Sequence, residues 1–543
     1  MTAHQKRWLV AGTSLFVVIA AGLFITALVM AKRVEPYIRA QALQYLRDRF
    51  NSDVELGEFQ VHVPPALPFR LLFHAGRGAL AKVEGTDLSL RLRGRSDQPP
   101  LLAIKRFDFE VDLGALLDNP KTVHRVTLDG MEIQIPPKGQ RPDLGSQDNS
   151  KETPKAKNGS GNVVIEEVLI RNASLIILPK KKAKTPLRFD IHDLRLESAG
   201  KDVAMKYTAV LTNPKPPGEI HATGVFGPWA TDEPGDTPLG GDYTFENADL
   251  GIFNGIAGIL RSTGKFEGSL SSITARGEAT VPDFRLKRSG NRVPLSTIFE
   301  VLVDGTNGNT ELKPVVATLG STHFTTTGFV VRHEGDVRKT ITLEAWMPSG
   351  NLRDVLSLAM KGPPMMEGTL KLTTKIGLPP LDQKVKEKLL LDGTFEITKG
   401  KFLRSQIQEK IDALSKRGQG KTGNQEVDEA ITRMSGDFKV ADQSITFRTL
   451  AFAIPGAAVN IGGSYDMDDD LLDFHGSLML DAKISQTQTG WKRWVLKPVD
   501  PFFSKRGAGT FLHIKIAGSA KDPQFGLDPG GTSPAEEAEK IAQ

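Results

Sequence analysis

The segment TLKLTTKI at residues 369–376 decides the fold class, because its apolar and polar side chains alternate. In an extended chain Leu372 and Ile376 point to one side, and Lys371 and Lys375 point to the other. Successive side chains of a β-strand face opposite sides of its sheet. This period of two therefore predicts a strand with one apolar face and one solvated face.

The same alternation recurs on both sides of this segment. Further strands are predicted at 107–113, 163–170, 444–454 and 511–516. A glycine followed two residues later by an aromatic residue also recurs, as in the pair Gly393 and Phe395. Glycine permits a tight turn or bulge, and the ring covers the gap beside it, so the repeat indicates successive hairpins. The sequence thus predicts a mostly β fold with helical insertions.

Helical periodicity interrupts the strands in several places. Apolar residues recur at the spacing of one helical face in 402–418, and again through Val427, Ile431 and Met434. Shorter helices are predicted at 36–50, 249–262 and 351–361. We expect the insertions within the sheet to cover part of it or to cap one of its ends.

The N-terminal segment from Trp8 to Ala31 contains no charged residue and is long enough to cross a hydrocarbon core of about 30 Å. The anchor predicted here exposes Trp8, Leu15, Phe16, Ile19, Leu23, Phe24 and Leu28 to lipid. A cleaved signal peptide has a shorter apolar stretch of roughly 7–15 residues, so we favour a retained span over cleavage after Val29 and Ala31. Basic residues flank both ends, but large domains translocate despite flanking charge, so the body is expected outside the cytoplasm.

Composition excludes several classes of function. The chain has no cysteine, so disulfides, thiolate metal sites and cysteine nucleophiles are absent. Its net charge of +5 is spread over 543 residues, whereas nucleic-acid binders concentrate charge on one face, so no nucleic-acid partner is expected. The 27 phenylalanines outnumber the 5 tyrosines and 5 tryptophans. Phenylalanine has no polar group, so this balance indicates a large, purely apolar surface.

Motifs that could carry chemistry have plainer explanations. Gly418, Gly420 and Gly423 spell GxGxxG but follow a helix rather than a strand, so we interpret them as a loop. The acidic cluster at Asp466 and 468–470 lacks the glycine and glutamate of a calcium loop and is interpreted as a solvated turn. We therefore predict no catalytic residue, no cofactor and no metal site, and expect that the protein is not an enzyme.

One segment near the C-terminus combines aromatic and basic residues. Trp491, Trp494, Phe502 and Phe503 are interleaved with lysine and arginine in 491–507. Tryptophan and basic residues both favour the lipid headgroup layer, so an interfacial segment is one interpretation. A helix that closes the end of the sheet with its rings inward is the other, and the sequence leaves both open.

Two polar segments divide the chain and are predicted to be disordered, because they cannot bury enough apolar surface. The predicted organisation is an anchor at 1–33, a juxtamembrane helix with an N-terminal β groove at 34–136, a linker at 137–162, a β body with helical insertions at 163–527 and a tail at 528–543.

Four stretches resemble AsmA-like proteins, and the likeness extends over nearly the whole chain. They are DVELGEFQVHVPP (53–65), GDYTFENADLGIFNGIAGILRSTGKFEGSL (241–270), LDGTFEITKGKF (391–402) and GTFLHIKIAGSAKDPQFGLD (509–528). The resemblance implies a long, twisted antiparallel sheet curled into an open apolar groove, as in the relatives TamB, YhdP and bridge-like lipid-transfer proteins. It also implies a single-pass bacterial inner-membrane protein whose body lies in the periplasm and supports phospholipid movement or outer-membrane homeostasis, without catalytic residues.

The candidate lipid groove consists of apolar residues that alternate along the predicted strands. They are Leu370, Leu372, Ile376, Phe395, Ile397, Phe438, Val440, Ile445, Phe447, Leu512, Ile514 and Ile516. A β-sandwich core requires the same pattern, so the sequence leaves groove and sandwich open. It also leaves open an envelope-assembly factor that pairs with outer-membrane proteins at an open sheet edge, and an anchored hydrolase.

Overall fold

The computed structural model describes the structured core of the chain. The described residues are 36, 39–40, 43–44, 47, 52–62, 80–92, 99–112, 121–135, 163–178, 186–199, 204–228, 230, 234–305, 307–333, 336, 338–403, 405–421, 432–483, 509–520 and 522–528. The predicted anchor, the segment 491–507 with its four aromatic residues, the linker 137–162 and the tail beyond Asp528 lie outside them. No helix of the described part is long and apolar enough to cross a membrane.

Strands make up most of the described residues and helices are few, which confirms the mostly β fold. The chain forms two compact units. Unit 1 contains Met1–Asn247 and Lys265–Ile273, and unit 2 contains Ala248–Gly264 and Thr274–Gln543. Three strands, β10 (Pro238–Asp249), β12 (Ile259–Ser269) and β13 (Ser272–Val281), contribute residues to both units.

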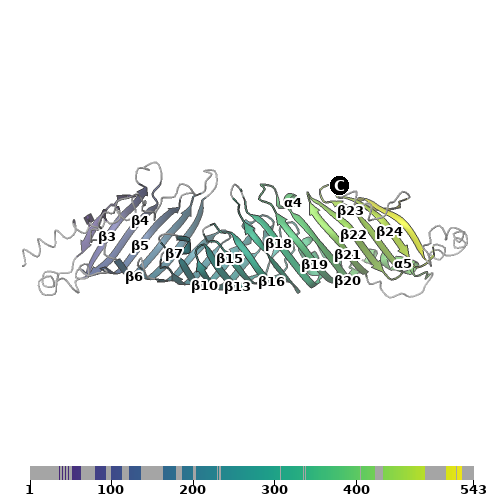
Figure 1. Ribbon diagram of the computed structural model, residues 1–543, viewed down its shortest axis with the longest axis horizontal. Coiled ribbons are helices and arrows are strands. Elements are labelled where there is room, and N and C mark those ends of the chain that lie inside the picture. The colour runs from purple at the N-terminus through teal and green to yellow at the C-terminus, as the bar shows by residue number, and fades with distance from the viewer. Residues whose placement is uncertain are drawn as a thin grey trace, which may run out of the picture. The chain divides into compact units, whose positions relative to one another are not determined.

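Unit 1 is built from long neighbouring strands, drawn in purple to blue in Figure 1. They are β1 (Ser52–Glu55), β2 (Phe59–His62), β3 (Leu80–Leu92), β4 (Leu102–Asp112), β5 (Lys121–Ile135), β6 (Val163–Ile177), β7 (Leu187–Ala199), β8 (Met205–Pro214), β9 (Pro217–Phe226) and β10 (Pro238–Asp249), with a 3₁₀ turn η2 (Pro234–Asp236). Both β1 and β2 pair with β3, and the order then follows the sequence from β3 to β10.

One pairing in unit 1 corrects the predicted antiparallel sheet. β5 and β6 run parallel, with Val126 opposite Val168 and Leu128 opposite Ile170. Parallel neighbours need a crossover connection of a dozen or more residues. The polar segment 136–162 between the two strands has that length, whereas a hairpin turn would have made the pair antiparallel.

The core of unit 1 lies on one face of its strands. Val83, Phe109, Val126 and Val168 follow one another across β3 to β6 in register. Val83 has no exposed surface, and Phe107 on the same face of β4 is 8% exposed. The opposite face carries charged pairs, such as the Arg125 Nε and Glu167 Oε2 atoms 2.5 Å apart. The alternation predicted at 107–113 is therefore present in the register of β4.

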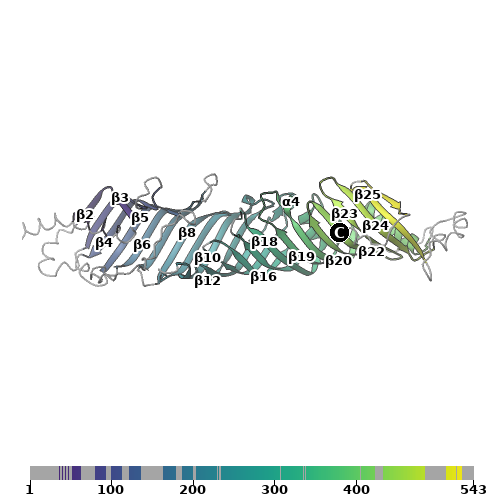
Figure 2. The same ribbon diagram turned by 45° about the horizontal axis from the view of Figure 1, so that its top comes forward.

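Unit 2 is built from a series of antiparallel strands, drawn in green to yellow in Figure 1 and seen at another angle in Figure 2. They are β15 (Leu295–Val303), β16 (Thr310–Leu319), β17 (Thr322–Val331), β18 (Thr340–Asn351), β19 (Met366–Leu378), β20 (Leu390–Phe402), β21 (Thr432–Ala441), β22 (Ser444–Ile454), β23 (Ala457–Asp466), β24 (Leu471–Leu480), β25 (Thr510–Ser519) and β26 (Asp522–Leu527). Each pairs with the next in sequence.

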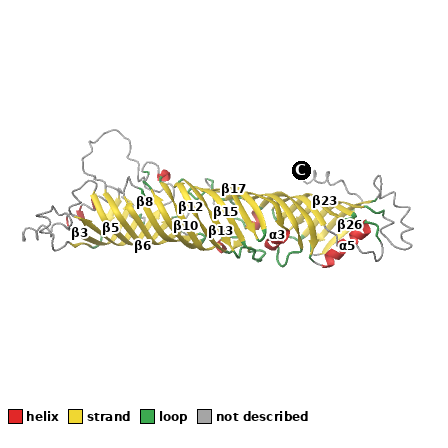
Figure 3. Cartoon of the chain, turned by 90° about the horizontal axis from the view of Figure 1, so that it is seen from below, coloured by secondary structure: helices red, strands yellow, loops and turns green. Residues whose placement is uncertain are grey.

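Three helices of unit 2 lie at the ends of its strands. The predicted helices at 351–361 and 402–418 are confirmed as α3 (Leu352–Ala359) and α5 (Ser405–Gly418). α3 begins after Asn351, whose side-chain oxygen accepts from the Arg353 N–H at 3.0 Å and so caps the helix. α4 (Val385–Lys388), which the sequence did not predict, lies at the other end of the strands. Figure 3 shows α3 and α5 on the near side when the chain is seen from below.

Two predicted helices are wrong in part. In 249–262 only the 3₁₀ turn η3 (Leu250–Ile252) is helical, and β11 (Ile256–Ala257) and the start of β12 follow it. Gly255 and Gly258 have φ of +99° and +142°, which no helix contains. The helix predicted through Met434 does not include that residue, because Met434 lies in β21 opposite Phe452, while residues 422–431 lie outside the description. Every described residue of the predicted 36–50 helix is helical.

Candidate functional site

All twelve candidate groove residues lie on one face of unit 2, between β19 and β25. The cross-strand register shows this directly, because residues that oppose each other on paired strands share a face. One row runs from Ile376 on β19 through Leu391 and Val440 to Ile445 on β22. A second row passes from Leu370 through Ile397 and reaches Leu512 on β25 by way of Met434, Phe452, Val459 and Leu478. We call this surface the apolar face.

Phenylalanines line the middle of the apolar face. Phe395 lies with its ring centroid 6.2 Å from that of Phe438 and 6.3 Å from that of Phe447. Phe447 in turn lies 6.0 Å from Phe474, and Ile516 opposes Phe474 on the next strand. Rings at these separations attract one another, so they form a continuous apolar band across five strands.

A glycine separates two of these rings in the register. Gly463 on β23 opposes Phe447 on one side and Phe474 on the other. Its φ is +150°, and a Cβ atom built there would lie 2.1 Å from the Asp473 carbonyl oxygen. Phe447 and Phe474 oppose Gly463 from the two neighbouring strands, so their relation to it differs from the repeat in the sequence, where the aromatic residue follows the glycine on the same strand.

Helices cover the apolar face only at one end of its strands. Val355 and Leu356 of α3 pack against the cluster that contains Leu370 and Ile397. Ile411 and Leu414 of α5 pack against the cluster around Ile454 and Ala457. Phe395, Phe438, Phe447 and Ile516 are half-buried, whereas Phe474 is only 6% exposed. Within the described residues the second sheet is only the two-residue pair of β11 (Ile256–Ala257) and β14 (Arg285–Leu286).

The opposite face of unit 2 is polar. On β19 Lys371, Thr373 and Lys375 are exposed, while Leu370 and Thr374 are buried. The Lys375 Nζ atom lies 3.3 Å from the Glu344 Oε1 atom of β18. The alternation in TLKLTTKI is therefore confirmed side chain by side chain.

The apolar face continues onto the last described strand. Phe525 of β26 opposes Ile516, and Leu527 opposes Ile514. These two side chains are 74% and 60% exposed, because β26 pairs only with β25 among the described strands. The sequence analysis did not single out either residue, although the segment was part of the AsmA-like stretch.

Other residues of the apolar face were also missed. They include Leu450, Ile461, Phe474 and Leu478. The alternation in LLDFHGSLML (471–480) would have identified two of them, because Leu472, Phe474 and Leu478 share one parity.

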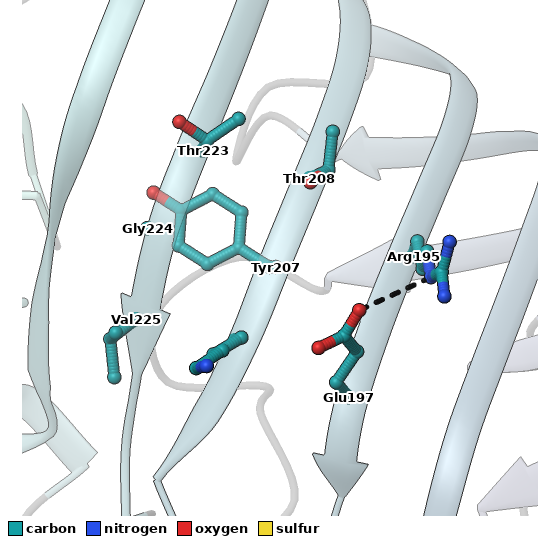
Figure 4. A pocket seen from close by; sticks show the side chains of 8 residues that line it. Arg195, Glu197, Tyr207, Thr208, Thr223, Gly224 and Val225 are labelled. Carbon is teal, nitrogen blue, oxygen red and sulfur yellow. Dashed lines mark ion pairs between the residues drawn. The ribbon is translucent and has the colours of Figure 1, made fainter.

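Unit 1 contains a shallow hollow of about 290 Å³ (Figure 4). It is lined by Arg195, Glu197, Lys206, Tyr207, Thr208, Thr223, Gly224 and Val225. The Arg195 guanidinium is already paired, with Nη2 2.8 Å from Glu167 Oε1 and Nε 3.4 Å from Glu197 Oε1. Burial, together with the charge of Asp242, raises the pKa of Tyr207 to about 12. A neutral phenol beside a paired arginine offers neither a base nor a nucleophile at neutral pH.

Acidic residues of the described part do not assemble into a metal site. No group of three or more histidine, aspartate or glutamate side chains there could hold an ion. At the predicted turn Asp466 Oδ1 accepts from the Asp468 and Asp469 N–H groups at 2.8 and 3.0 Å, and these bonds lower its pKa. Asp470 accepts from the Tyr465 hydroxyl at 2.9 Å. The cluster is thus a hydrogen-bonded turn between β23 and β24.

Comparison with protein-family models, with characterised proteins and with solved structures found no match. The likeness to AsmA-like proteins therefore stays an expectation drawn from the residues, and the site must be argued from its own geometry.

Proposed function

We propose that the protein carries phospholipid, with acyl chains lying on the apolar face of unit 2 and no enzymatic step. The observation that carries this proposal is the row of half-buried rings of Phe395, Phe438 and Phe447, which continues through the buried Phe474. Soluble surfaces rarely keep a contiguous apolar patch in water unless something binds there. The proposal includes a groove open to solvent, a single-pass anchor in a bacterial inner membrane and a body in the periplasm, as in AsmA-like proteins.

The free energy of lipid transfer explains why such a face would be useful. Exposing one CH₂ group to water costs about 0.8 kcal/mol, so a chain of roughly sixteen carbons costs about 13 kcal/mol. An apolar face beside a polar one removes most of this cost while the headgroup stays in water. A β-sandwich core would need a second covering layer, and the contacts of α3 and α5 at one strand end do not supply it.

A salt bridge supports curvature of the sheet in unit 2. The Lys386 Nζ atom of α4 lies 3.3 Å from the Asp468 Oδ1 atom. α4 precedes β20, whereas Asp468 follows β23, three strands further along. Neighbouring strands are about 4.8 Å apart, so a flat sheet would separate these positions by about 14 Å. The contact favours a sheet whose strand ends approach one another, which is the form of a groove.

Native mass spectrometry of the full chain, purified from a bacterial membrane without harsh delipidation, tests the proposal. We expect co-purified phospholipid with the wild type and its loss in Leu372→Asp and Ile514→Asp. Thr373→Asp is the matched control, because Thr373 follows Leu372 on β19 and faces the polar side. Circular dichroism and thermal unfolding confirm that each variant is folded. A folded wild type without lipid would overturn the lipid-carrying function.

A second candidate function rests on the edge strand β26. Phe525 and Leu527 are exposed there, and an unpaired strand edge can accept a strand from another protein. In this alternative the protein is an envelope-assembly factor that acts on outer-membrane proteins rather than on lipids. Lipid-free wild type that forms a specific complex with an outer-membrane protein, lost in Phe525→Asp, would favour it over lipid carriage.

A further inference from the structure

A small ribbon in unit 2 lies apart from the main strands. It consists of η3, β11 (Ile256–Ala257) and β14 (Arg285–Leu286), and β11 and β14 pair antiparallel with Ile256 opposite Leu286. Backbone hydrogen bonds fix its shape, among them Lys287 N to Gly255 O at 2.9 Å and Leu250 N to Gly258 O at 2.9 Å. We call residues 250–258 and 283–292 the ribbon.

The ribbon is attached at both ends of β19. The Asn291 side-chain amide donates to the carbonyl oxygens of Ser357, Met360 and Gly362, each at 2.9 Å, at the C-terminal end of α3. At the other end a Cβ atom built on Gly255 would lie 3.8 Å from a Val385 methyl carbon of α4. α3 precedes β19 and α4 follows it, so the ribbon runs along the length of that strand.

The ribbon lies on the side of the apolar face. α3, to which it is bonded, packs its own apolar residues on Leu370 and Ile397 of that face. Burial and the hydrogen bond to Asp470 raise the pKa of Tyr465, and the charge of Arg288 acts in the opposite direction. Tyr465 shares the apolar face, opposite Ile445 and Leu472. The ribbon therefore lies beside β19, on the side of the sheet that α3 covers.

The ribbon carries a concentration of positive charge in the sequence FRLKRSGNR (284–292). Arg285 is neutralised by Asp283, with Nη1 and Oδ2 3.2 Å apart. The Lys287 Nζ atom donates to the Gly251 carbonyl oxygen at 2.7 Å, and this neutral partner leaves its charge uncompensated. Arg288 is exposed and has no ion pair within the described residues. Lys287 and Arg288 are therefore two uncompensated cations on a ribbon that is bonded to α3 beside the apolar face.

We propose that Arg288, assisted by Lys287, binds the anionic headgroup of an amphiphile whose acyl chains lie on the apolar face. An arginine guanidinium presents a fork of N–H donors that matches phosphate oxygens, and a lysine adds a point charge. This inference rests on the proposed function and adds a preference for anionic over zwitterionic lipid.

Lipid competition on the full chain tests this inference. Delipidated protein is incubated with equal amounts of phosphatidylglycerol and phosphatidylcholine in vesicles, and the bound lipid is measured by native mass spectrometry. Both headgroups carry a phosphate, but the choline ammonium of phosphatidylcholine offsets its charge and is repelled by Arg288 and Lys287. We therefore expect the wild type to prefer phosphatidylglycerol by about five-fold. Arg288→Gln should reduce the preference to about two-fold or less, and Arg288→Glu should remove it.

Arg433→Gln is the matched control. Arg433 is exposed on β21 and faces the polar side, because its neighbour Met434 lies on the apolar face. This variant should keep the wild-type preference, and the thermal unfolding of all variants should match. Inorganic phosphate at the same concentration should not displace lipid, whereas displacement would identify a simple anion site and overturn the inference. Binding of both lipids without preference overturns the headgroup site alone, and binding of neither overturns the proposed function as well.

Discussion

The two units bury their apolar faces to different depths. In unit 1 the face of β3 to β6 is closed, with Val83 at 0%, Leu90 at 3% and Ile104 at 5% exposed. In unit 2 Phe395, Phe438 and Phe447 in the middle of the face are half-buried, although Phe474 and Val440 on the same face are each 6% exposed. The same alternating pattern therefore produces a closed core in one unit and a less completely closed apolar face in the other.

The largest difference between the units should come from burying a charge. Val83→Asp places a carboxylate where unit 1 has no exposed surface, so we expect a loss of about 4 kcal/mol or more in its free energy of unfolding. Ile516→Asp places the same group on the apolar face of unit 2, where Ile516 is half-buried and water can reach it. We expect this variant to lose about 1–2 kcal/mol in its free energy of unfolding.

Urea unfolding combined with limited proteolysis measures this pair, because proteolytic fragments report on each unit separately. Equal losses in the two variants would show that the apolar face of unit 2 is as closed as that of unit 1. That result would also weaken the proposal that the face is free to hold lipid.

The apolar face of unit 2 was the part of the molecule that the sequence predicted best. All twelve groove residues share one side, because a period of two places them there and the register shifts of β19–β20 and β21–β22 leave them on the same face. The parallel β5–β6 pair was missed, since alternation describes a strand and says nothing of its neighbour's direction. The helix predicted at 249–262 was wrong because the apolar residues there have helical spacing, but Gly255 and Gly258 adopt positive φ angles that interrupt a helix.

The ribbon could not be predicted either. Its position depends on Asn291, which reaches α3 through bonds to residues 66, 69 and 71 positions away in sequence. The basic run 284–292 was visible in the sequence, but nothing local indicates that it faces an apolar surface. Long-range contacts of this kind arise from packing and leave no periodic signal.

A glycine substitution should produce the next largest effect and sharpen the comparison from within unit 2. Gly463→Val forces a branched side chain into φ of +150° and against the Asp473 carbonyl oxygen, so we expect a loss of about 2–4 kcal/mol. Gly526→Ala is the control, because the new Cβ atom would lie 3.8 Å from the Lys515 side chain, which is an ordinary van der Waals contact. Chemical denaturation measures both, and a tolerated Gly463→Val would mean that the phenylalanine band adapts freely.

A smaller, pH-dependent effect is expected in unit 1. The folded pKa of Tyr207 is about 12, above the ordinary value of 10.0, so the folded state holds its proton more tightly than the unfolded state. The stability that this provides is complete below about pH 10 and is lost as pH rises toward 12, by about 1–2 kcal/mol after allowance for partial exposure. Tyr207→Phe should abolish this part of the alkaline loss. Denaturation curves in that pH range would contradict the assignment if both proteins lost stability equally.

The smallest loss of stability is expected from a substitution on β26, the edge strand of unit 2, and it contrasts with the same substitution on an edge strand of unit 1. Phe59 on the edge strand β2 of unit 1 is 5% exposed, whereas Phe525 on β26 of unit 2 is 74% exposed. Phe525→Ser should therefore change the free energy of unfolding by less than about 0.5 kcal/mol, while Phe59→Ser should cost about 3 kcal/mol. Thermal unfolding of the two variants measures the contrast. A large loss in Phe525→Ser would mean that something covers β26 in the folded protein, and the apolar face would then end at β25 rather than continue to an open edge.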